Sequence, residues 1–579
     1  MKRKTLMNLM GLLFLLVGCG PTQEPTTSIE QPTSTTNTPT TTVESTEVAL
    51  EDQQKPTSTN LQYDEYSMGT KANFDTSKWY RNDLKDMPLP DPAVIEVGDK
   101  YYVYGTTDRT GSNTLDCYET EDFNSFKLFM NIESMPSDYW GQKILFAPEV
   151  YYYNNLYWLY YSDNSKETNL RYINVLTSES PTGPFAPYKG KNAEGKDVDA
   201  SKEPLFRHND TLGLSALDQT VFFDDDGSIY MYYSIYDTGI MQYIVGVEMI
   251  DPVTPDWETY KILVRPGELT PKTSRTNLLI WEAYSGFKVA EGPFMLKSPN
   301  GTYYLTYSVN HYDDRYYTVC YAYSDEPLGD YQKPYTKDGN WTNVLFGYAG
   351  GMAHTAVFDQ WQGFMSGTGH HCFFKSGDQY MIGYHAHKDR KGKVDAGDGF
   401  AGRMFAMDYL YFDENGVPYT EGPTYSVQPL PTKISGYKNI ALGAKVKSTN
   451  VINPERVNDN FIVEHYNLPQ EQDREVTLTK GKSFIEIDFG REYHIGGISV
   501  YNSAFYDEYL SSIDFINFFD GNAILDAEFP DTYLNDEYEF IFPTSAFVFD
   551  FEDIVASRVV IGFNTNSETR INEIKVFGY

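Results

Sequence analysis

Cysteine is scarce in this sequence, and so is positive charge. Four cysteines in 579 residues are too few for a disulfide scaffold, and the chain contains neither a CxxC nor an HExxH pattern. Only 46 Lys and Arg stand against 81 Asp and Glu, which gives a formal net charge of −35. A chain this acidic repels phosphate backbones. These shortages argue against a disulfide-stapled fold, a zinc site and a nucleic-acid partner.

Long apolar runs are also few, and the one at the N-terminus is typical of a secretory signal. Lys2, Arg3 and Lys4 precede an apolar stretch, 9–18, that is too short to span a bilayer. The stretch ends in Leu-Val-Gly before Cys19, which resembles the bacterial lipoprotein box. The resemblance implies that residues 1–19 form a lipoprotein signal, that Cys19 is lipidated, and that the protein is held extracytoplasmically on the cell surface or envelope membrane. An ordinary signal peptide with a chance cysteine is the alternative.

Residues 20–60 contain Thr, Ser, Pro and Gln with almost no large apolar side chain. Such a segment cannot bury enough surface to fold, so we expect a disordered tether. Beyond Cys19 the chain has Cys117, Cys320 and Cys372, an odd number that allows at most one disulfide.

Aromatic residues, in contrast, are abundant at 16%, with 49 tyrosines, and they fall into a repeat. A turn followed by a tyrosine-rich strand recurs five times at intervals of roughly 55–80 residues, and a short apolar strand precedes each copy. The tyrosines that lead the five copies are Tyr101, Tyr157, Tyr230, Tyr303 and Tyr380. Five all-β units of this length predict a five-bladed β-propeller.

In a propeller the first strand of each blade begins at one mouth of the central channel. Asp91, Asp218 and Glu291 each stand three positions before the first apolar residue of such a strand. Acidic residues are common in this chain, so three carboxylates at one register could arise by chance. The alternative interpretation is that they converge in space and carry chemistry.

Several short motifs resemble glycoside hydrolase family 43 over roughly residues 80–431. They occur in order at blade spacing: Asp91-Pro92, Ala147-Pro148-Glu149-Val150, Asp218 ahead of Asp224-Asp225-Asp226-Gly227, Glu291-Gly292-Pro293, Gly367-Thr368-Gly369-His370, Tyr384-His385-Ala386-His387, and a tail from Arg403 to Thr424. The resemblance implies a five-bladed propeller, over residues 61–431, with three carboxylates around a pocket.

The resemblance also implies roles for these residues. Asp91 would be the general base, Glu291 the general acid, and Asp218 the residue that raises the pKa of the acid and orients it. An inverting enzyme needs the base and the acid roughly 6.5–9.5 Å apart, with room for a water. His370 matches a histidine that helps hold a structural Ca²⁺ through water in this family, although a buried core histidine fits equally. No cofactor is required for the chemistry.

Other polar residues have structural alternatives. Arg315 is a candidate for contact with a sugar hydroxyl or a solvated surface arginine, and Glu149 is expected at the rim or in a structural role. His385 and His387 alternate on one strand face without an evident third metal ligand, which favours a structural or substrate-edge role. The stretch 224–227 is interpreted as a hairpin turn rather than a calcium loop.

After Pro431 the pattern changes. Segments such as 439–443, 484–490 and 571–578 alternate apolar and polar residues, as strands with one buried face do. Their succession resembles a discoidin (coagulation factor 5/8 type C) module, which implies a jelly-roll β-sandwich over residues 436–579. It is interpreted either as a carbohydrate-binding module or as a purely structural domain.

The sequence therefore predicts an all-β protein, a propeller followed by a sandwich, whose partners are a polysaccharide or oligosaccharide and, through the lipid anchor, a membrane. The expected activity is that of an inverting, exo-acting glycoside hydrolase on plant polysaccharide side chains, first an α-L-arabinofuranosidase and second a β-D-xylosidase. An exo-β-1,3-galactanase is an alternative within the family. A non-catalytic glycan-binding surface lipoprotein is the alternative outside it.

Overall fold

A computed structural model of the chain describes the region of residues 62–579 with internal gaps. The described ranges are 62–63, 74–82, 87–107, 115–131, 135–208, 213–237, 241–268, 279, 282, 288–313, 317–334, 343–347, 366–387, 403–424, 427–462, 475–503, 510, 512–520, 523–525 and 546–579. The predicted signal, Cys19 and the tether 20–60 lie outside them. Within these ranges no helix has the length and apolar character needed to cross a membrane.

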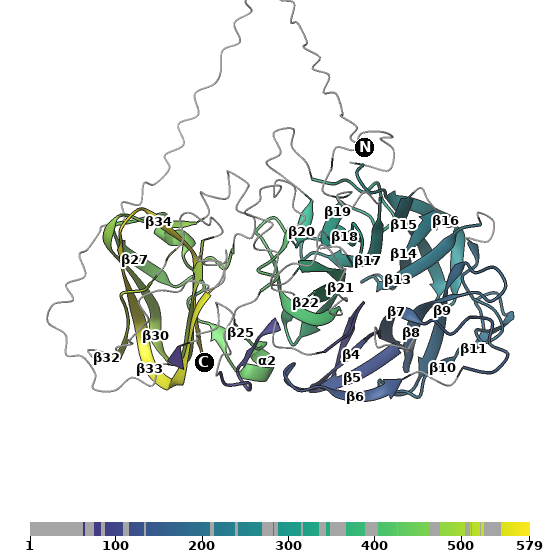
Figure 1. Cartoon of the computed structure of the whole chain (residues 1–579), viewed down its shortest axis with the longest axis horizontal. Helices are drawn as coiled ribbons and strands as arrows, with labels where there is room; N and C mark the ends of the chain where they lie inside the picture. The colour runs from purple at the N-terminus through teal and green to yellow at the C-terminus, as the bar shows by residue number, and fades with distance from the viewer. Residues whose placement is uncertain are drawn as a thin grey trace, which may run out of the picture. The chain divides into compact units, whose positions relative to one another are not determined.

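Five four-stranded antiparallel sheets follow one another along the chain, and each is one blade of a propeller (Figure 1). In chain order the blades are β3 Ala93–Val97, β4 Lys100–Thr106, β5 Leu115–Thr120 and β6 Lys127–Asn131; β7 Phe146–Tyr153, β8 Leu156–Asn164, β9 Arg171–Ser178 and β10 Ala186–Pro187; β13 Ser215–Phe223, β14 Ile229–Asp237, β15 Met241–Asp251 and β16 Thr254–Val264; β17 Ala290–Lys297, β18 Tyr303–Val309, β19 Thr318–Ser324 and β20 Val344–Phe346; and β21 Ser366–Ser376, β22 Gln379–His387, β23 Met404–Phe412 and β24 Pro418–Thr420. The predicted five-bladed arrangement is confirmed. A small extra hairpin pairs β11 Lys189–Lys191 with β12 Asp197–Asp199.

The tyrosine-rich strands are the second strands of the blades, and their hydroxyls explain why tyrosine is used there. Aromatic residues suit a pleated, buried surface, but a buried hydroxyl must find a partner. In the first three blades Tyr104, Tyr160 and Tyr232 occupy equivalent positions in their sheets. They donate to the backbone carbonyls of Pro181, Pro252 (2.8 Å) and Pro327 (3.0 Å), respectively, each of which lies one blade further along the chain. These tyrosines therefore join neighbouring blades.

The turns between first and second strands are tight, as the sequence predicts. In the segment 224–227 the amide of Gly227 donates to the carbonyl of Asp224, and Gly227 has a φ of 90°, a conformation that glycine adopts without strain. The Asp224 carboxylate pairs with Lys297 and accepts a bond of 2.6 Å from Tyr303. The interpretation as a hairpin turn is confirmed.

The C-terminal part is a second all-β body. Ten strands of the described residues form one antiparallel sheet with the path β28-β29-β34-β30-β33-β31-β32, joined at its sides by β1, β26 and β27. Their bounds are β1 Gln62–Tyr63, β26 Lys438–Asn439, β27 Lys445–Thr449, β28 Val451–Ile452, β29 Val476–Leu478, β30 Gly481–Asn502, β31 Phe515–Asp520, β32 Ala523–Leu525, β33 Ala546–Thr565 and β34 Thr569–Gly578. A short helix, α2 Thr432–Ser435, and a 3₁₀ turn, Pro454–Arg456, complete this part.

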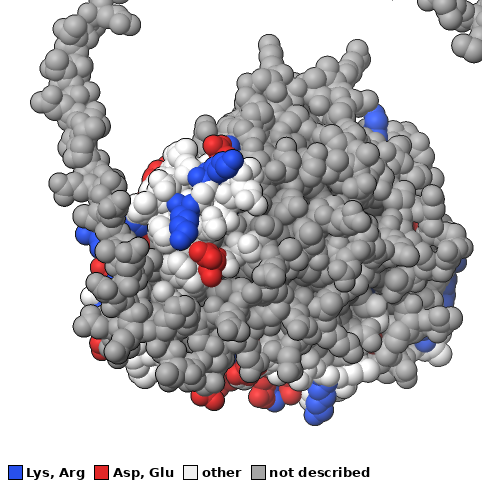
Figure 2. Space-filling view, turned by 60° about the vertical axis from the view of Figure 1, so that its left-hand side comes forward, with Lys and Arg blue, Asp and Glu red and all other residues white. Residues whose placement is uncertain are grey.

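The long strands β30 and β33 change register at two places, which lets one sheet fold over its own core, as in a sandwich. Fully buried side chains from these strands, including Ile485, Val500 and Ile561, fill the interior with residues of β29 and β34. On the outer surface, described Lys and Arg side chains stand beside Asp and Glu (Figure 2). Lys447 also pairs at 2.7 Å with Glu486, a buried carboxylate.

One short strand connects the two bodies. In β2, Trp79–Tyr80, which pairs with β25, Gln428–Pro429, consecutive side chains point to opposite sides. Trp79 packs edge-on against Phe577 of β34 at 5.2 Å between ring centroids, whereas the Tyr80 hydroxyl donates to the carbonyl of Met407 in β23. This strand therefore binds the C-terminal sheet with one residue and the fifth blade with the next.

Candidate active site

Each blade begins with the same irregularity of the backbone. In the second to fifth blades, the pairing of the first two strands skips two residues, and the first of these has a left-handed φ in every case: Ala147, Asp218, Gly292 and His370. Asp91 in the first blade has the same conformation, with a φ of 54°. Non-glycine residues adopt this conformation only when their surroundings enforce it. We refer to these five positions as the bulge positions.

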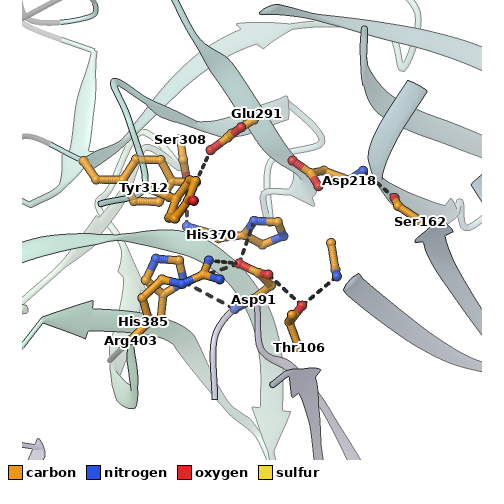
Figure 3. Close-up of polar contacts among 12 residues, drawn as sticks. Asp91, Thr106, Ser162, Asp218, Glu291, Ser308, Tyr312, His370, His385 and Arg403 are labelled. Carbon is orange, nitrogen blue, oxygen red and sulfur yellow. Dashed lines mark hydrogen bonds and ion pairs between the residues drawn. The ribbon is translucent and has the colours of Figure 1, made fainter. Parts of the chain in front are cut away.

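The predicted common register of the three carboxylates is therefore wrong by one residue for Glu291. Asp91 and Asp218 occupy bulge positions, but in the fourth blade the bulge position belongs to Gly292, and Glu291 precedes it and still pairs with Ser308. Counting back from the first apolar residue does not reveal this shift. In the fourth blade that residue, Phe294, lies two positions after the bulge position, whereas Val94 and Val221 lie three positions after theirs. The three carboxyl groups nevertheless converge (Figure 3).

Side chains of the second strands hold these bulge positions from the neighbouring blade. The Thr106 hydroxyl accepts the backbone N–H of Ala147 at 2.8 Å, Ser162 accepts that of Asp218 at 3.1 Å, and Ser308 accepts that of His370 at 2.8 Å. At the junction of the fifth and first blades a ring nitrogen replaces the hydroxyl, since the backbone N–H of Asp91 donates to Nδ1 of His385 at 3.3 Å. Each bulge position in this set is thus fixed by the preceding blade.

Asp91 lies in the most densely bonded environment of the three. Its Oδ1 is 2.8 Å from Nη1 of Arg403 and 3.3 Å from Nδ1 of His370, and its Oδ2 accepts a bond of 2.7 Å from the Thr106 hydroxyl. Burial alone would raise the pKa of Asp91, but the charges of Arg403 and His370 and the bonds from Thr106 and Arg403 outweigh burial and lower it. Asp91 is therefore an ionised carboxylate at neutral pH.

The pKa of Asp218 is shifted in the opposite direction. It is 5% exposed, and burial raises its pKa to about 7, a shift that the nearby carboxylates of Glu291 and Asp91 increase and the charges of His370 and Arg171 oppose. Two carboxyl groups at the same site thus differ in proton affinity, which is the arrangement that acid–base chemistry requires.

Glu291 is partly exposed and has two fixed donors. Gln242 Nε2 donates to its Oε2 at 2.8 Å, and the Tyr317 hydroxyl donates to its Oε1 at 2.9 Å. Gln242 belongs to the third strand of the third blade, and Tyr317 immediately precedes the third strand of the fourth blade. The orientation of the Glu291 carboxyl group is therefore set from two blades.

The proton affinity of Asp218 has a measurable effect on stability. Because the folded protein holds this proton more tightly than the unfolded chain, the free energy of unfolding should fall by about 2–3 kcal/mol between pH 5 and pH 8 on account of this group. Asp218→Asn should remove this fall. The measurement is urea unfolding of both proteins at the two pH values, and an equal pH dependence in both would contradict the prediction.

The remaining predicted residues have different outcomes. Arg315 lies outside the described residues. His387 Nε2 donates to the carbonyl of Tyr312, 2.9 Å away, and His385 is fully buried. Their structural or substrate-edge role stays a prediction. Glu149 is 9% exposed, and burial raises its pKa. Cys117, Cys320 and Cys372 are buried free thiols.

Four residues at the site were not predicted to support it: Thr106, Gln242, Tyr317 and Arg403. Arg403 was recognised only as the start of a motif. Gln242, Tyr317 and Arg403 share a signal, because each lies at or just before the start of a third strand. In an antiparallel blade the first and third strands begin at the same edge, so these side chains lie beside the first strands' carboxylates.

The chain resembles known proteins over the propeller. The model of the family "Glycosyl hydrolases family 43" matches residues 80–418. Similar curated proteins include "Extracellular endo-alpha-(1->5)-L-arabinanase 1" of Bacillus subtilis (strain 168), 26% identical over 48% of this chain and 75% of that one, and "Xylosidase/arabinosidase 43A" of Humicola insolens, 27% identical over 58% of this chain and 96% of that one. A crystal structure of a thermostable family-43 glycoside hydrolase is 27% identical over 61% of this chain and 99% of that one, with a TM-score of 0.45.

Proposed function

Because the chain belongs to glycosyl hydrolase family 43, we propose that it removes single pentose residues from plant polysaccharide side chains with inversion at the anomeric carbon. The observation that carries the proposal is the difference in pKa between Asp91 and Asp218 at a site where three carboxyl groups converge. Asp91 is held ionised by Arg403, whereas Asp218 next to Glu291 keeps a proton up to near-neutral pH. In such a site the base, Asp91, and a carboxyl group that can hold a proton, Asp218, lie on separate blades.

In this proposal Asp91 removes a proton from the attacking water while Glu291 protonates the leaving oxygen. The Thr106 hydroxyl and the Arg403 guanidinium fix both oxygens of Asp91, so that the remaining lone pairs are available to the water. Asp218 and Glu291 are close enough to oppose each other's ionisation, so an ionised Asp218 favours the protonated acid. No step requires a bound metal.

An α-L-arabinofuranoside is the first substrate we propose and a β-D-xyloside the second. Names such as "Extracellular exo-alpha-(1->5)-L-arabinofuranosidase ArbA" and "Beta-xylosidase" among the relatives support this choice. An exo-β-1,3-galactanase stays the alternative within the family. A glycan-binding lipoprotein without activity is disfavoured, because binding alone does not require carboxylates of unequal proton affinity.

The test is a panel of nitrophenyl α-L-arabinofuranoside, β-D-xyloside and β-D-galactoside together with arabinan, arabinoxylan and β-1,3-galactan. We expect monosaccharide release from the pentose substrates, and proton NMR should show the first product as the inverted anomer. Release of oligosaccharides alone would contradict exo action, and no release from any substrate would contradict the enzyme itself.

Further parts of the proposal concern regions beyond the propeller site. We assign residues 1–19 to a lipoprotein signal cut before Cys19, residues 20–60 to a tether, residues 61–431 to the catalytic domain and residues 436–579 to a discoidin-like module. The protein would thus act outside the cytoplasm from a membrane anchor, in line with relatives named extracellular. Metabolic labelling with a palmitate analogue, lost in Cys19→Ala, tests the anchor.

A structural Ca²⁺ near His370 is the last element of the proposal. Among the described residues, no three His, Cys, Asp or Glu side chains gather in a way that could hold a metal ion. The ion would therefore depend on water and on backbone oxygens, with His370 as an outer contact.

A further inference from the structure

Each oxygen of the Glu291 carboxyl group accepts a hydrogen bond from a different side chain. Tyr317 bonds Oε1 and Gln242 bonds Oε2, so each oxygen has its own partner. We propose that Tyr317 and Gln242 are positioning residues that orient Glu291 toward the leaving oxygen and set the pH above which it no longer protonates that oxygen. This inference rests on the proposed function, and specifically on Glu291 as the general acid.

Tyr317 is held too firmly to be an incidental neighbour. It is fully buried, and its ring stacks on the ring of His385 with centroids 5.5 Å apart and an interplanar angle of 10°. A Cβ atom at Gly369 would lie 2.5 Å from two ring carbons of Tyr317, so the absence of a side chain there admits the ring. The hydroxyl can therefore point in few directions.

The stack also links the acid to the base. Nδ1 of His385 accepts the backbone N–H of Asp91, which means that the ring is neutral and carries its proton on Nε2. Burial, together with the charges of Arg403 and His370, lowers the pKa of His385, which agrees with a neutral ring. The stacked rings of Tyr317 and His385 thus hold both residues: His385 bonds the backbone of Asp91, and Tyr317 bonds the side chain of Glu291.

Gln242 supplies the second fixed point. Its side chain is 5% exposed, and its backbone N–H donates to the carbonyl of Lys288 at 2.8 Å, just ahead of β17, the strand that carries Glu291. An amide NH₂ group can only donate, so this contact favours an acceptor at Oε2. The contact therefore directs the position of the proton on Glu291 as well as the angle of its carboxyl plane.

Hydrogen bonds donated to a carboxylate stabilise its ionised form. The other charged or titratable groups that face this part of the site are Asp218, Asp91 and His370, with Arg171 acting on Asp218. Asp218 favours the protonated acid, and the two donors oppose it. The working pH range then reflects a balance that Tyr317 and Gln242 shift toward lower pH.

The experiment compares Tyr317→Phe and Gln242→Met with wild type in pH profiles of kcat/KM on aryl glycosides of good and poor leaving groups. Each variant should move the alkaline limb upward by about one pH unit. Each should also lose about 10-fold or more in kcat on the poor leaving group, with a smaller loss on the good one, which needs less protonation.

Tyr160→Phe is the matched control, since it removes another buried hydroxyl that bridges two blades but lies away from the three carboxyl groups. It should lower stability without moving the pH limb. If Tyr317→Phe folds but behaves like Tyr160→Phe, the inference is overturned while the proposed function stands. Where Tyr317→Phe fails to fold, Gln242→Met decides by the same criteria. Wild-type protein that cleaves no substrate would overturn the proposed function and this inference together.

Discussion

Asp91→Ala is expected to lower kcat by about 10²–10⁴-fold on every substrate that the wild-type protein cleaves, including aryl glycosides with good leaving groups. The reason is that Asp91 would activate the attacking water, a step that every substrate shares. Glu291→Ala should cost a similar factor on natural linkages but much less on good leaving groups, which depart without a proton. This difference assigns the two roles separately.

The measurement is steady-state kinetics on a leaving-group series at the pH optimum of each protein. Asp226→Asn is the matched control, because Asp226 is an exposed carboxylate of the hairpin turn that accepts the amide N–H of Ser228 in its own turn. It should retain full activity. Activity of Asp91→Ala within a few-fold of wild type would end the assignment of the base.

Lys575→Met should lower the free energy of unfolding by about 3–5 kcal/mol, the largest effect on stability that we expect. Lys575 on β34 is 3% exposed and forms an ion pair with Glu421, which follows the last strand of the propeller and is also 3% exposed. Burial by itself would lower the pKa of Lys575, but the Glu421 carboxylate outweighs it and raises the pKa. Removing the lysine leaves Glu421 buried without its counter-charge.

Urea unfolding of the purified full chain measures this change. Lys191→Met is the control, since its pair with Asp197 is exposed and such pairs contribute little. The double variant Glu421→Gln/Lys575→Met should recover part of the loss, because neither charge is then left alone. A loss below about 1 kcal/mol in Lys575→Met would show that water reaches this contact.

The blades could be predicted from the sequence because each is a local unit. A glycine turn, a tyrosine-rich strand and a preceding apolar strand all lie within about 20 residues of one another, so the pattern of each copy stands alone. The candidate carboxylates could be found for the same reason, since they sit at the starts of first strands. The sequence does not reveal the offset of Glu291, because the apolar run of the fourth blade begins at Phe294, one position closer to the bulge than in the first and third blades.

The supporting residues could not be predicted in this way. Arg403 is more than 300 positions from Asp91, and their contact exists only because the fifth blade closes on the first. Gln242 and Tyr317 reach Glu291 from different blades, and the one signal they share is their place at the starts of third strands. The neutral state of His385 likewise follows from a backbone N–H that only the closed ring brings near.

The bulge positions have a consequence for how such a site changes over time. The main chain already adopts the same constrained conformation at Ala147, where a small side chain stands, as at Asp91, Asp218 and His370. Exchanging the side chain there requires no new backbone geometry, and Asn or Asp would suit that geometry better than alanine does. The backbone conformation of a bulge position thus does not depend on which side chain it carries. Substitutions at Ala147 are therefore the first to try in a search for new specificities.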